Sequence, residues 1–291
     1  MTMRIGIVGW GEIAQEHAFH LKSAGAKLAG IVSRRRNLDL EVPVFGSLQD
    51  MLPSVDAFTI AVPNHLHASV CLQGIKARKP VLVEKPLCIN KEDLNQLASI
   101  MPKMKVPVHL GYRLRWNPSI QSLKRRLQGI RQVRCIYRIG IEHLAHRKDW
   151  IRDVAFSGGA LLGIGVHALD LARWLAGARG EALTEWQVSA DVMSSSANFP
   201  LCASISGTLR SGAKITAGAD LRGSSDSEIE LNVDAEQGGY PDGELPPPRP
   251  EDERAEYAGL IRNFIKAVER EEWDPIETAE ILQTHRELLL G

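Results

Sequence analysis

The stretch RIGIVGWGEIA, Arg4–Ala14, opens as an apolar run and continues as the first turn of a helical pattern. A glycine-rich turn with the spacing G-x-G-x-x-A joins the two parts. Gly9 permits the tight turn, Gly11 lets the backbone approach a pyrophosphate, and the small Ala14 lets helix and strand pack closely. The helix N-terminus then faces the phosphates, which predicts a dinucleotide-binding unit, the alternative being a glycine turn in a nucleotide-free α/β protein. The residues predicted to hold the cofactor here are Gly9, Trp10, Gly11, Glu12, Ile13 and Ala14.

Short apolar runs alternate with helical patterns over the first part of the chain. After the opening run they are Lys27–Ser33, Ala57–Val62, Pro80–Glu84 and Val106–Leu110. Near-continuous apolar strands separated by helices indicate a parallel sheet that is buried on both faces. We therefore predict an α/β fold whose residues 1–118 form a Rossmann domain.

After residue 118 the pattern changes. A basic helix-like stretch (SIQSLKRRLQG), a strand candidate (VRCIYRIGIEHL) and a helix around Gly165–Ala176 come first. Four strand-like segments then follow one another with short turns: EWQVSADVM, CASISGTLR, AKITAGADL and SEIELNVD. Such a succession indicates an antiparallel sheet. Residues 119–291 are therefore predicted to form an α+β domain with an open-faced, mostly antiparallel sheet.

The end of the chain has two further features. The Pro-rich stretch Glu244–Asp252 is predicted to be an extended loop. The segments EYAGLIRNFIKAVERE and ETAEILQTHRELLL have the spacing of two amphipathic helices. We expect these last helices to be able to pack back on the first domain.

The composition excludes several classes of protein. Lys plus Arg equals Asp plus Glu at 35 each, so the overall charge favours neither nucleic acid nor anionic membrane as a partner. The four cysteines are scattered without CxxC spacing, which indicates reduced thiols of a cytoplasmic protein. No signal-peptide pattern precedes the first strand, and no apolar run approaches the roughly 18 residues of a membrane span. We expect a cytoplasmic protein with a small-molecule substrate.

The end of the second predicted strand bears on the choice of cofactor. It reads Ser33-Arg34-Arg35-Arg36, and no acid precedes Asp39. NAD sites usually place an acid there to hold the ribose hydroxyls, and that acid would repel a 2′-phosphate. Serine and arginine can bond the phosphate instead. The sequence predicts that NADP(H) is preferred and NAD(H) possible, with Ser33, Arg34 and Arg35 as ligands; the alternative is a solvated arginine loop.

The stretch VLVEKPLCIN, Val81–Asn90, ends an apolar run in Glu84 and Lys85, followed by Pro86. If the run is an interior parallel strand, Lys85 lies at its carboxyl end, where open α/β sheets bind their ligands. If the run is a surface strand, Lys85 is an ordinary solvated charge. The surrounding pattern of strands and helices favours the interior strand.

Several segments together resemble a known family. GIVGWGEIAQEH, VPNHLHASVCLQGIKARKPVLVEKPL, GYRLRWNP and SGGALLGIGVHALDLARWLAG are similar to segments of the Gfo/Idh/MocA oxidoreductases, which include glucose–fructose oxidoreductase and inositol dehydrogenase. The resemblance spans nearly the whole chain, since the closing RNFIKAVE also looks like the family's C-terminal helix. It implies a Rossmann domain, an open-faced C-terminal sheet, and hydride transfer with NAD(P) on sugars, polyols and their derivatives.

The resemblance implies two catalytic residues. Lys85 would lie beside the nicotinamide and bond the substrate oxygen, where an ammonium stabilises a developing alkoxide. His167 would transfer a proton, as an imidazole does near neutrality, unless it is a satisfied histidine of a helix core. The remaining cofactor contacts that we expect are Pro63, Asn64, His67 and Glu84, although His67 could instead support a helix N-terminus.

One position departs from the family's D-x-G-x-H pattern. Gly163 stands where the aspartate usually precedes the histidine by four residues. Either the substrate is bulkier or supplies its own group, or the chemistry needs one acid fewer, or the site has decayed.

The other substrate candidates are weaker. They are Tyr112, Arg115, Lys148, Trp150, Gly163 and Asp170. Arg115 could instead form an interdomain salt bridge, and Asp170 could orient His167 or serve a structural hydrogen bond. His143 and His146 form an H-x-x-H without further ligands at a suitable spacing, so we predict no metal site.

The sequence therefore predicts an NADP(H)-dependent oxidoreductase of a sugar-like or other small polar carbonyl or alcohol. One alternative is a non-catalytic NADP(H)-binding sensor or scaffold, which Gly163 motivates. Another is a reductase of an imine or an unsaturated bond in natural-product or pigment metabolism. An open-faced sheet is expected to leave a large apolar face, so we predict a homodimer or homotetramer through the C-terminal sheet.

Overall fold

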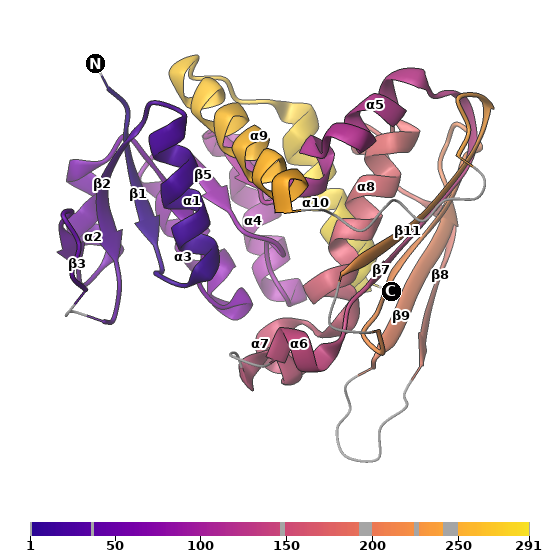
Figure 1. Cartoon of the computed structure of the whole chain (residues 1–291), viewed down its shortest axis with the longest axis horizontal. Coiled ribbons are helices and arrows are strands. Elements are labelled where there is room, and N and C mark those ends of the chain that lie inside the picture. Colours follow the sequence, from indigo (N-terminus) through magenta and orange to yellow (C-terminus); the bar gives the residue numbers. More distant parts are fainter. Residues whose placement is uncertain are drawn as a thin grey trace.

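The computed structural model describes residues 2–35, 38–145, 149–191, 200–223, 227–240 and 250–290. Two sheets lie at opposite ends of the molecule, with helices between them (Figure 1). The N-terminal half holds a parallel sheet, and the C-terminal half holds a mixed sheet backed by one helix. The predicted fold class is confirmed.

The first sheet has six strands in the order β3-β2-β1-β4-β5-β6. The strands are β1 (Arg4–Val8), β2 (Lys27–Val32), β3 (Val44–Phe45), β4 (Ala57–Ile60), β5 (Val81–Val83) and β6 (Val108–Leu110). Every neighbouring pair is parallel, and the strand order reverses between β1 and β4. Dinucleotides bind at such a switch point, outside the carboxyl ends of the strands. The five predicted strands are present, and the two-residue β3 was missed because so short a strand has no detectable period.

Helices connect these strands and cover the sheet. They are α1 (Glu12–Ser23), α2 (Leu48–Met51), η1 (Leu52–Ser54), η2 (Asn64–Leu66), α3 (His67–Lys76) and α4 (Lys91–Met104). The interior strands β4 and β5 are buried along their whole length. Lys85 therefore follows an interior strand, and the solvated-strand alternative is excluded for β5.

The second sheet has the order β11-β7-β10-β9-β8. Its strands are β7 (Gln128–Arg138), β8 (Thr184–Asp191), β9 (Cys202–Thr208), β10 (Lys214–Asp220) and β11 (Glu228–Gln237). Neighbours are antiparallel except β7 and β10, which are parallel. Helix α8 (Val166–Ala176) packs on β7 and β10, on the face turned toward the first domain (Figure 1).

Short elements join the two halves. They are η3 (Arg113–Trp116), α5 (Pro118–Arg126), α6 (Ile141–Ala145), η4 (Asp149–Arg152), α7 (Val154–Ser157) and the π-helical turn η5 (Leu161–Gly165). The strand predicted over VRCIYRIGIEHL ends at Arg138, because Gly140 pairs once with Arg222 and α6 then begins. The predicted extended loop Glu244–Asp252 lies partly outside the described residues, but Pro250 already starts a helix, the position where proline favours a helix N-terminus.

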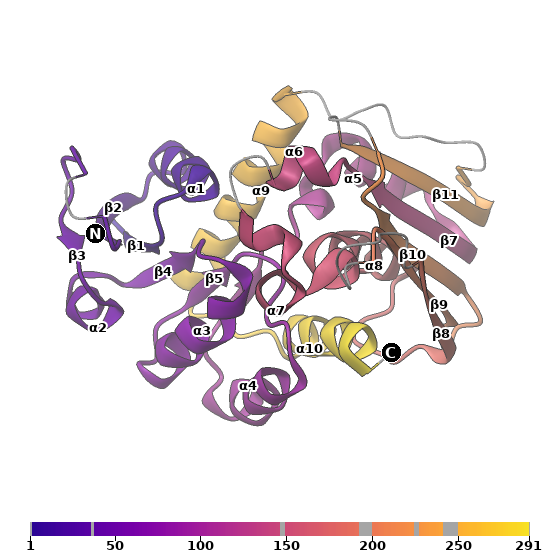
Figure 2. The same ribbon diagram turned by 90° about the horizontal axis from the view of Figure 1, so that it is seen from below.

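The last two helices return to the first domain. Helix α9 (Pro250–Glu269) lies along α1, and its Tyr257 and Phe264 share a buried core with Ile5 and Leu21. Helix α10 (Pro275–Leu290) lies between α4 and α8 (Figure 2). The expected return of these helices is confirmed.

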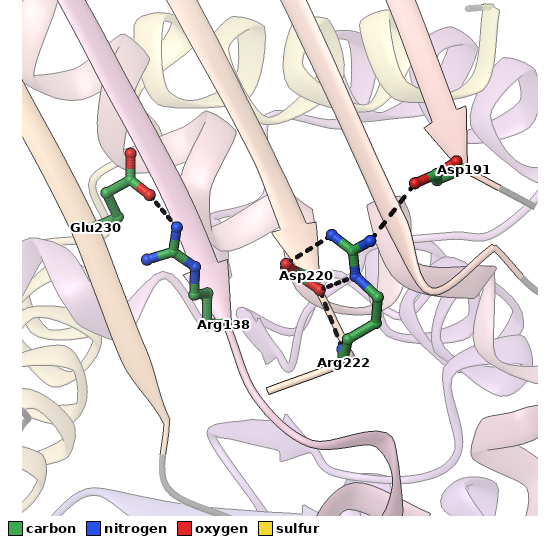
Figure 3. Close-up of polar contacts among 5 residues, drawn as sticks. All are labelled: Arg138, Asp191, Asp220, Arg222 and Glu230. Atoms are coloured by element: carbon green, nitrogen blue, oxygen red, sulfur yellow. Dashed lines mark hydrogen bonds and ion pairs between the residues drawn. The ribbon is translucent and has the colours of Figure 1, made fainter. Parts of the chain in front are cut away.

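The outer face of the second sheet is polar, so the expected large apolar face is wrong for the described strands. Strand alternation turns Ile215 and Ala217 inward, where both are buried, and leaves polar side chains outside. Figure 3 shows Arg138 bonded to Glu230, and Arg222 bonded to Asp220 at 2.8 Å and Asp191 at 3.5 Å. A covering partner would therefore meet ion pairs and small polar side chains.

One stretch passes a test for membrane-spanning helices by length and composition. It is Val154–Ala176, of 23 residues, so the expectation that no run approaches that length is wrong by this measure. However, 61% of its apolar 18-residue segment is buried inside the protein, as in a core helix. The stretch is also interrupted at Gly158 and Gly159, between α7 and η5, where both residues have positive φ.

Candidate active site

The turn between β1 and α1 forms a cradle with room for a phosphate group. Gly9 has φ +103°, and a Cβ atom there would lie 2.3 Å from the carbonyl oxygen of Ala61. Gly11 is the N-cap of α1, and a Cβ atom there would meet nothing within 4 Å. Ala14 is fully buried where the helix packs on the sheet. Gly11 has no side chain to cap the first N–H groups of α1, so these donors suit a pyrophosphate.

The carboxyl end of β2 offers a cationic lining. The Ser33 hydroxyl accepts a bond from the Arg35 N–H at 3.0 Å, and the Ser33 N–H donates to the Phe45 carbonyl at 3.2 Å. Arg34 and Arg35 are exposed. Residues 33–35, which follow β2, include no acidic side chain. The chemistry of these groups suits an anionic substituent on the ribose.

Lys85 lies at the carboxyl end of β5, half-buried, and its Nζ donates to the carbonyl oxygen of Gly163 at 2.8 Å. The peptide bond between Lys85 and Pro86 is cis. Gly163 belongs to the π-helical turn η5, and such turns occur frequently at functional sites. The position that lacks the family's aspartate therefore contacts the predicted catalytic lysine through its backbone.

His167 lies on the first turn of α8 and is 5% exposed. Its ring stacks on Tyr137 with centroids 5.8 Å apart, and its Nδ1 has no hydrogen-bond partner among the described residues. Burial, and then the charges of Lys85 and Arg113, hold the pKa of His167 well below its ordinary value of 6.5. The imidazole is therefore neutral near pH 7 and can accept a proton.

Glu84 points away from Lys85, toward α1. Its Oε1 lies 3.1 Å from His17 Nε2, and a Cβ atom at Gly111 would approach this carboxylate to 2.8 Å. Burial favours the protonated acid, but the bond to His17 and the nearby positive groups together lower the pKa of Glu84. In the described structure Glu84 joins the sheet to α1, which leaves a direct contact with the cofactor as a prediction.

His67 is buried, and the protein backbone occupies both of its ring nitrogens. Nδ1 lies 2.6 Å from the carbonyl oxygen of Pro86, and Nε2 lies 2.8 Å from that of Val62. Burial lowers the pKa of His67, and the two carbonyls oppose this change. These bonds go to backbone carbonyls and not to the first N–H groups of α3, so they differ from the expected support of a helix N-terminus. A direct contact of His67 with the cofactor stays a prediction. Before it on η2, the Asn64 amide donates to the Ser157 carbonyl at 2.8 Å, and Pro63 precedes the same turn.

Arg115 and Asp170 bind each other. Arg115 Nε donates to Asp170 Oδ2 at 2.9 Å, and its Nη1 donates to Glu280 of α10 at 3.1 Å. Burial raises the pKa of Asp170 to about 6, and Arg115 opposes this change. The guanidinium also lies 5.3 Å from the ring centroid of Tyr112. The interdomain salt bridge expected as the alternative for Arg115 is present, and through it Asp170 makes the structural hydrogen bond that was its alternative. A substrate contact by either residue stays a prediction.

The remaining candidate residues are an aromatic residue, a lysine and the two histidines of the H-x-x-H pattern. Trp150 is half-buried in η4, and Lys148 lies outside the described residues. Among the residues that the structure describes, no group of three His, Cys, Asp or Glu could hold a metal ion. His143 is exposed, and His146 lies outside the described ranges.

Sequence reasoning missed three residues near the site. Tyr137 stacks on His167, and Arg113 donates to the Tyr137 hydroxyl at 3.4 Å while pairing with Glu253 at 3.1 Å. His285 of α10 accepts a bond from the Leu87 N–H at 2.8 Å. The inward position of Tyr137 is readable from strand alternation, but no local pattern points to His285.

A glycine cradle at the switch point of a parallel sheet, with Lys85 and His167 in front of it, defines a two-domain dinucleotide-binding protein. Residues 3–112 match the family model described as "Oxidoreductase family, NAD-binding Rossmann fold", and residues 125–240 match the "GFO/IDH/MocA C-terminal domain". The chain belongs to the Gfo/Idh/MocA family of oxidoreductases.

Relatives and solved structures agree with this family. Inositol 2-dehydrogenase 2 of Saccharopolyspora erythraea is 30% identical over 191 residues, which are 61% of this chain and 55% of that protein. The match thus spans little more than half the length of this curated relative. Scyllo-inositol dehydrogenase of Lactobacillus casei, solved with NAD(H) and scyllo-inositol, gives a TM-score of 0.80 at 19% identity, covering 99% of this chain and 95% of that one. GenD2 from gentamicin A biosynthesis, solved with NAD, gives 0.81 at 20% identity, covering 98% and 92%. At these identities the two structures show the fold alone.

Proposed function

We propose that the protein is an NADP(H)-dependent oxidoreductase that interconverts an alcohol and a carbonyl on a sugar-like or other small polar substrate. The observation that carries this proposal is the convergence of Lys85 and His167 at the carboxyl edge of the first sheet. They come from different domains, and the Lys85 charge acts on the His167 ring. The cofactor would bind at the switch point on this same edge of the sheet.

The two side chains have complementary roles. In alcohol oxidation, neutral His167 accepts the hydroxyl proton while the Lys85 ammonium stabilises the negative charge that develops on the oxygen. In the reverse direction, Lys85 polarises the carbonyl. A nicotinamide bound in the cradle would accept or supply the hydride. The low pKa keeps His167 deprotonated near neutral pH, so the ring is available as a base for oxidation although it binds the proton less tightly than a free imidazole.

The NADP(H) preference rests on Ser33, Arg34 and the absence of an acid at the described end of β2. NADPH should raise the melting temperature more than NADH at equal concentration, because the tighter ligand stabilises the folded state more. Arg34→Ala should weaken NADPH binding roughly 5- to 30-fold, the value of about 1–2 kcal/mol for an exposed charge-assisted bond, and leave NADH binding nearly unchanged.

Lys76→Ala is the matched control. Lys76 is exposed in the last turn of α3, which runs back to the start of β5 and so away from the cradle. The variant removes the same charge and should leave both affinities unchanged. Equal melting shifts with the two cofactors in the unmodified protein would refute the preference.

The substrate class is tested by a hydride-transfer screen over aldoses, polyols and imines with both cofactors. Turnover of polyols or aldoses supports the proposal, whereas turnover of imines alone would favour the alternative chemistry. Cofactor binding without turnover of any of them would favour the sensor. We also propose a cytoplasmic homodimer or homotetramer through the C-terminal sheet, in which ion pairs and small polar side chains of the outer face, rather than an apolar surface, would form the contact.

A further inference from the structure

Two buried histidines hold one peptide unit beside Lys85. The carbonyl oxygen of Pro86 lies 2.6 Å from His67 Nδ1, and the N–H of Leu87 donates to His285 Nε2 at 2.8 Å. With the single ring proton of a neutral His67 on Nδ1, both polar atoms of the peptide between Pro86 and Leu87 are bound by imidazoles. One imidazole comes from the start of α3 and the other from α10, 198 residues beyond Leu87.

The tautomer of His285 follows from its partners. Its Nδ1 lies 2.8 Å from the carbonyl oxygen of Ile281, so this nitrogen carries the proton and Nε2 is free to accept. The side chain is fully buried, and burial lowers the pKa of His285 to about 4. The ring therefore stays neutral near pH 7, as an acceptor of the Leu87 N–H requires.

This segment needs such partners because the strand ladder ends just before it. The last ladder bond on this side joins the Glu84 N–H to the Ile60 carbonyl at 2.9 Å. Pro86 has no N–H to donate. Leu87 is fully buried, so an unbonded N–H there would carry a desolvation cost.

Helix α10 also holds the element that carries His167. Its Glu280 bonds Arg115, which binds Asp170 of α8, three residues after His167. Its Glu287 pairs with Arg173 of α8 at 2.7 Å, and both side chains are buried. One helix therefore bonds both the segment that follows Lys85 and the helix that carries His167.

We infer that His285 and His67 are positioning residues for Lys85, and that they fix the backbone from which its ammonium reaches the substrate oxygen. This inference rests on the proposed function for its catalytic consequence. Its structural content, a fixed Lys85, is measurable without any substrate.

The test compares His285→Gln with His285→Asn. Glutamine can place its side-chain oxygen where Nε2 lies, and asparagine is one bond too short to reach Leu87. The probe is reductive methylation of the free protein with formaldehyde. The measured quantity is the methylation ratio, which is the extent of methylation at Lys85 divided by that at exposed Lys76, determined by mass spectrometry. We expect the ratio to rise at least about threefold in the asparagine variant through local opening, and to stay at the original value in the glutamine variant.

The matched control is His109→Asn. His109 is also buried and also bonds α10, through Glu277 at 3.0 Å, but it has no described contact with Pro86 or Leu87. Its methylation ratio should equal that of the unmodified protein. On the opposite side, His67→Asn keeps a donor near the Pro86 carbonyl and should preserve the ratio, whereas His67→Leu should raise it; this pair decides the question if the His285 variants do not fold.

Turnover with NADPH supplies the second measurement, on a substrate found by the screen. His285→Asn should lower kcat at least about tenfold with KM and NADPH affinity nearly unchanged, since displacement of a catalytic group costs rate rather than binding. In His285→Gln, kcat should stay near that of the unmodified protein. Equal methylation ratios in the folded asparagine and glutamine variants would overturn the inference. A normal turnover in Lys85→Ala would instead refute the proposed function and leave the methylation result standing.

Discussion

The empty position at Gly163 offers the sharpest perturbation of the site. A Cβ atom there would meet only the Ser157 carbonyl oxygen, at an ordinary 3.5 Å, and the backbone is not in the left-handed region. Gly163→Asp should therefore fold. Its carboxylate would lie beside Lys85, whose Nζ already bonds the Gly163 carbonyl at 2.8 Å.

The attraction between the new carboxylate and a nearby positive charge is large compared with the free energy of a one-unit pKa shift. Opposite charges about 4 Å apart attract by about 4 kcal/mol at an effective dielectric constant of 20, whereas a shift of one pKa unit corresponds to about 1.4 kcal/mol. The pKa of His167 is now held down by burial, Lys85 and Arg113. The new carboxylate neutralises part of this positive field and stabilises the imidazolium, so the pKa of His167 should rise by at least about one unit.

The measurement is an NMR titration of the His167 ring, whose signal is assigned by its loss in His167→Gln. Gly163→Asn is the matched control, because it has the same size without the charge and should titrate like the unmodified protein. Aspartate and asparagine variants that titrate alike would refute the placement of Gly163, Lys85 and His167 in one site. Turnover carries a second expectation for the alternative in which the substrate is bulkier or supplies its own group at this position: the acid should then raise KM.

Four further outcomes are expected. Lys85→Ala should lower kcat/KM at least about a hundredfold in a turnover assay, the scale of one positioned electrostatic group, with NADPH affinity by calorimetry nearly unchanged. Gly11→Val should leave the melting temperature of the free protein unchanged and weaken cofactor binding at least about tenfold, because it fills the pyrophosphate space, whereas Gly9→Ala should destabilise the fold, since its Cβ would lie 2.3 Å from a backbone oxygen. Burial raises the pKa of Asp170 from 3.8 to about 6, so Asp170 binds its proton more tightly in the folded state. Its contribution to the free energy of unfolding is therefore full below about pH 4 and is lost, on the order of 3 kcal/mol, as pH rises through 6. Urea unfolding of Asp170→Asn between pH 4 and 7 should lack this pH-dependent loss of stability. Thr216→Glu, at the centre of the outer sheet face, should convert the proposed oligomer to a monomer in light scattering; an unchanged mass would place the interface elsewhere.

The fold was predictable because its decisive signals are local. The turn after β1 needs glycine at Gly9 for steric reasons that the sequence states directly, and the apolar run of β5 places Lys85 at the sheet edge. The polar outer face was also readable in principle. Arg134 and Arg138 alternate with buried residues in β7, which indicates charged side chains on the outer face.

The environment of the site was less predictable because it depends on contacts distant in sequence. The sequence around Arg115 cannot show whether this residue binds the substrate or binds Asp170, since its guanidinium charge suits both roles. His285 lies in an ordinary amphipathic segment, and its partner Leu87 is 198 residues away. Only the packed arrangement of α10 brings the two together.

The return of α9 to the first domain has a consequence for synthesis. The face of α1 around Leu21 and the strand residue Ile5 are covered by Tyr257 and Phe264. A ribosome that has finished β6 at Leu110 must still add about 150 residues before Phe264 exists, which takes roughly 8 to 30 seconds at about 5–20 residues per second. During that interval the newly made Rossmann domain exposes an apolar surface that its own later helix will cover. Nascent chains halted between these two points should bind a chaperone that recognises apolar surface, and chains extended past α9, far enough for that helix to leave the ribosomal tunnel, should release it.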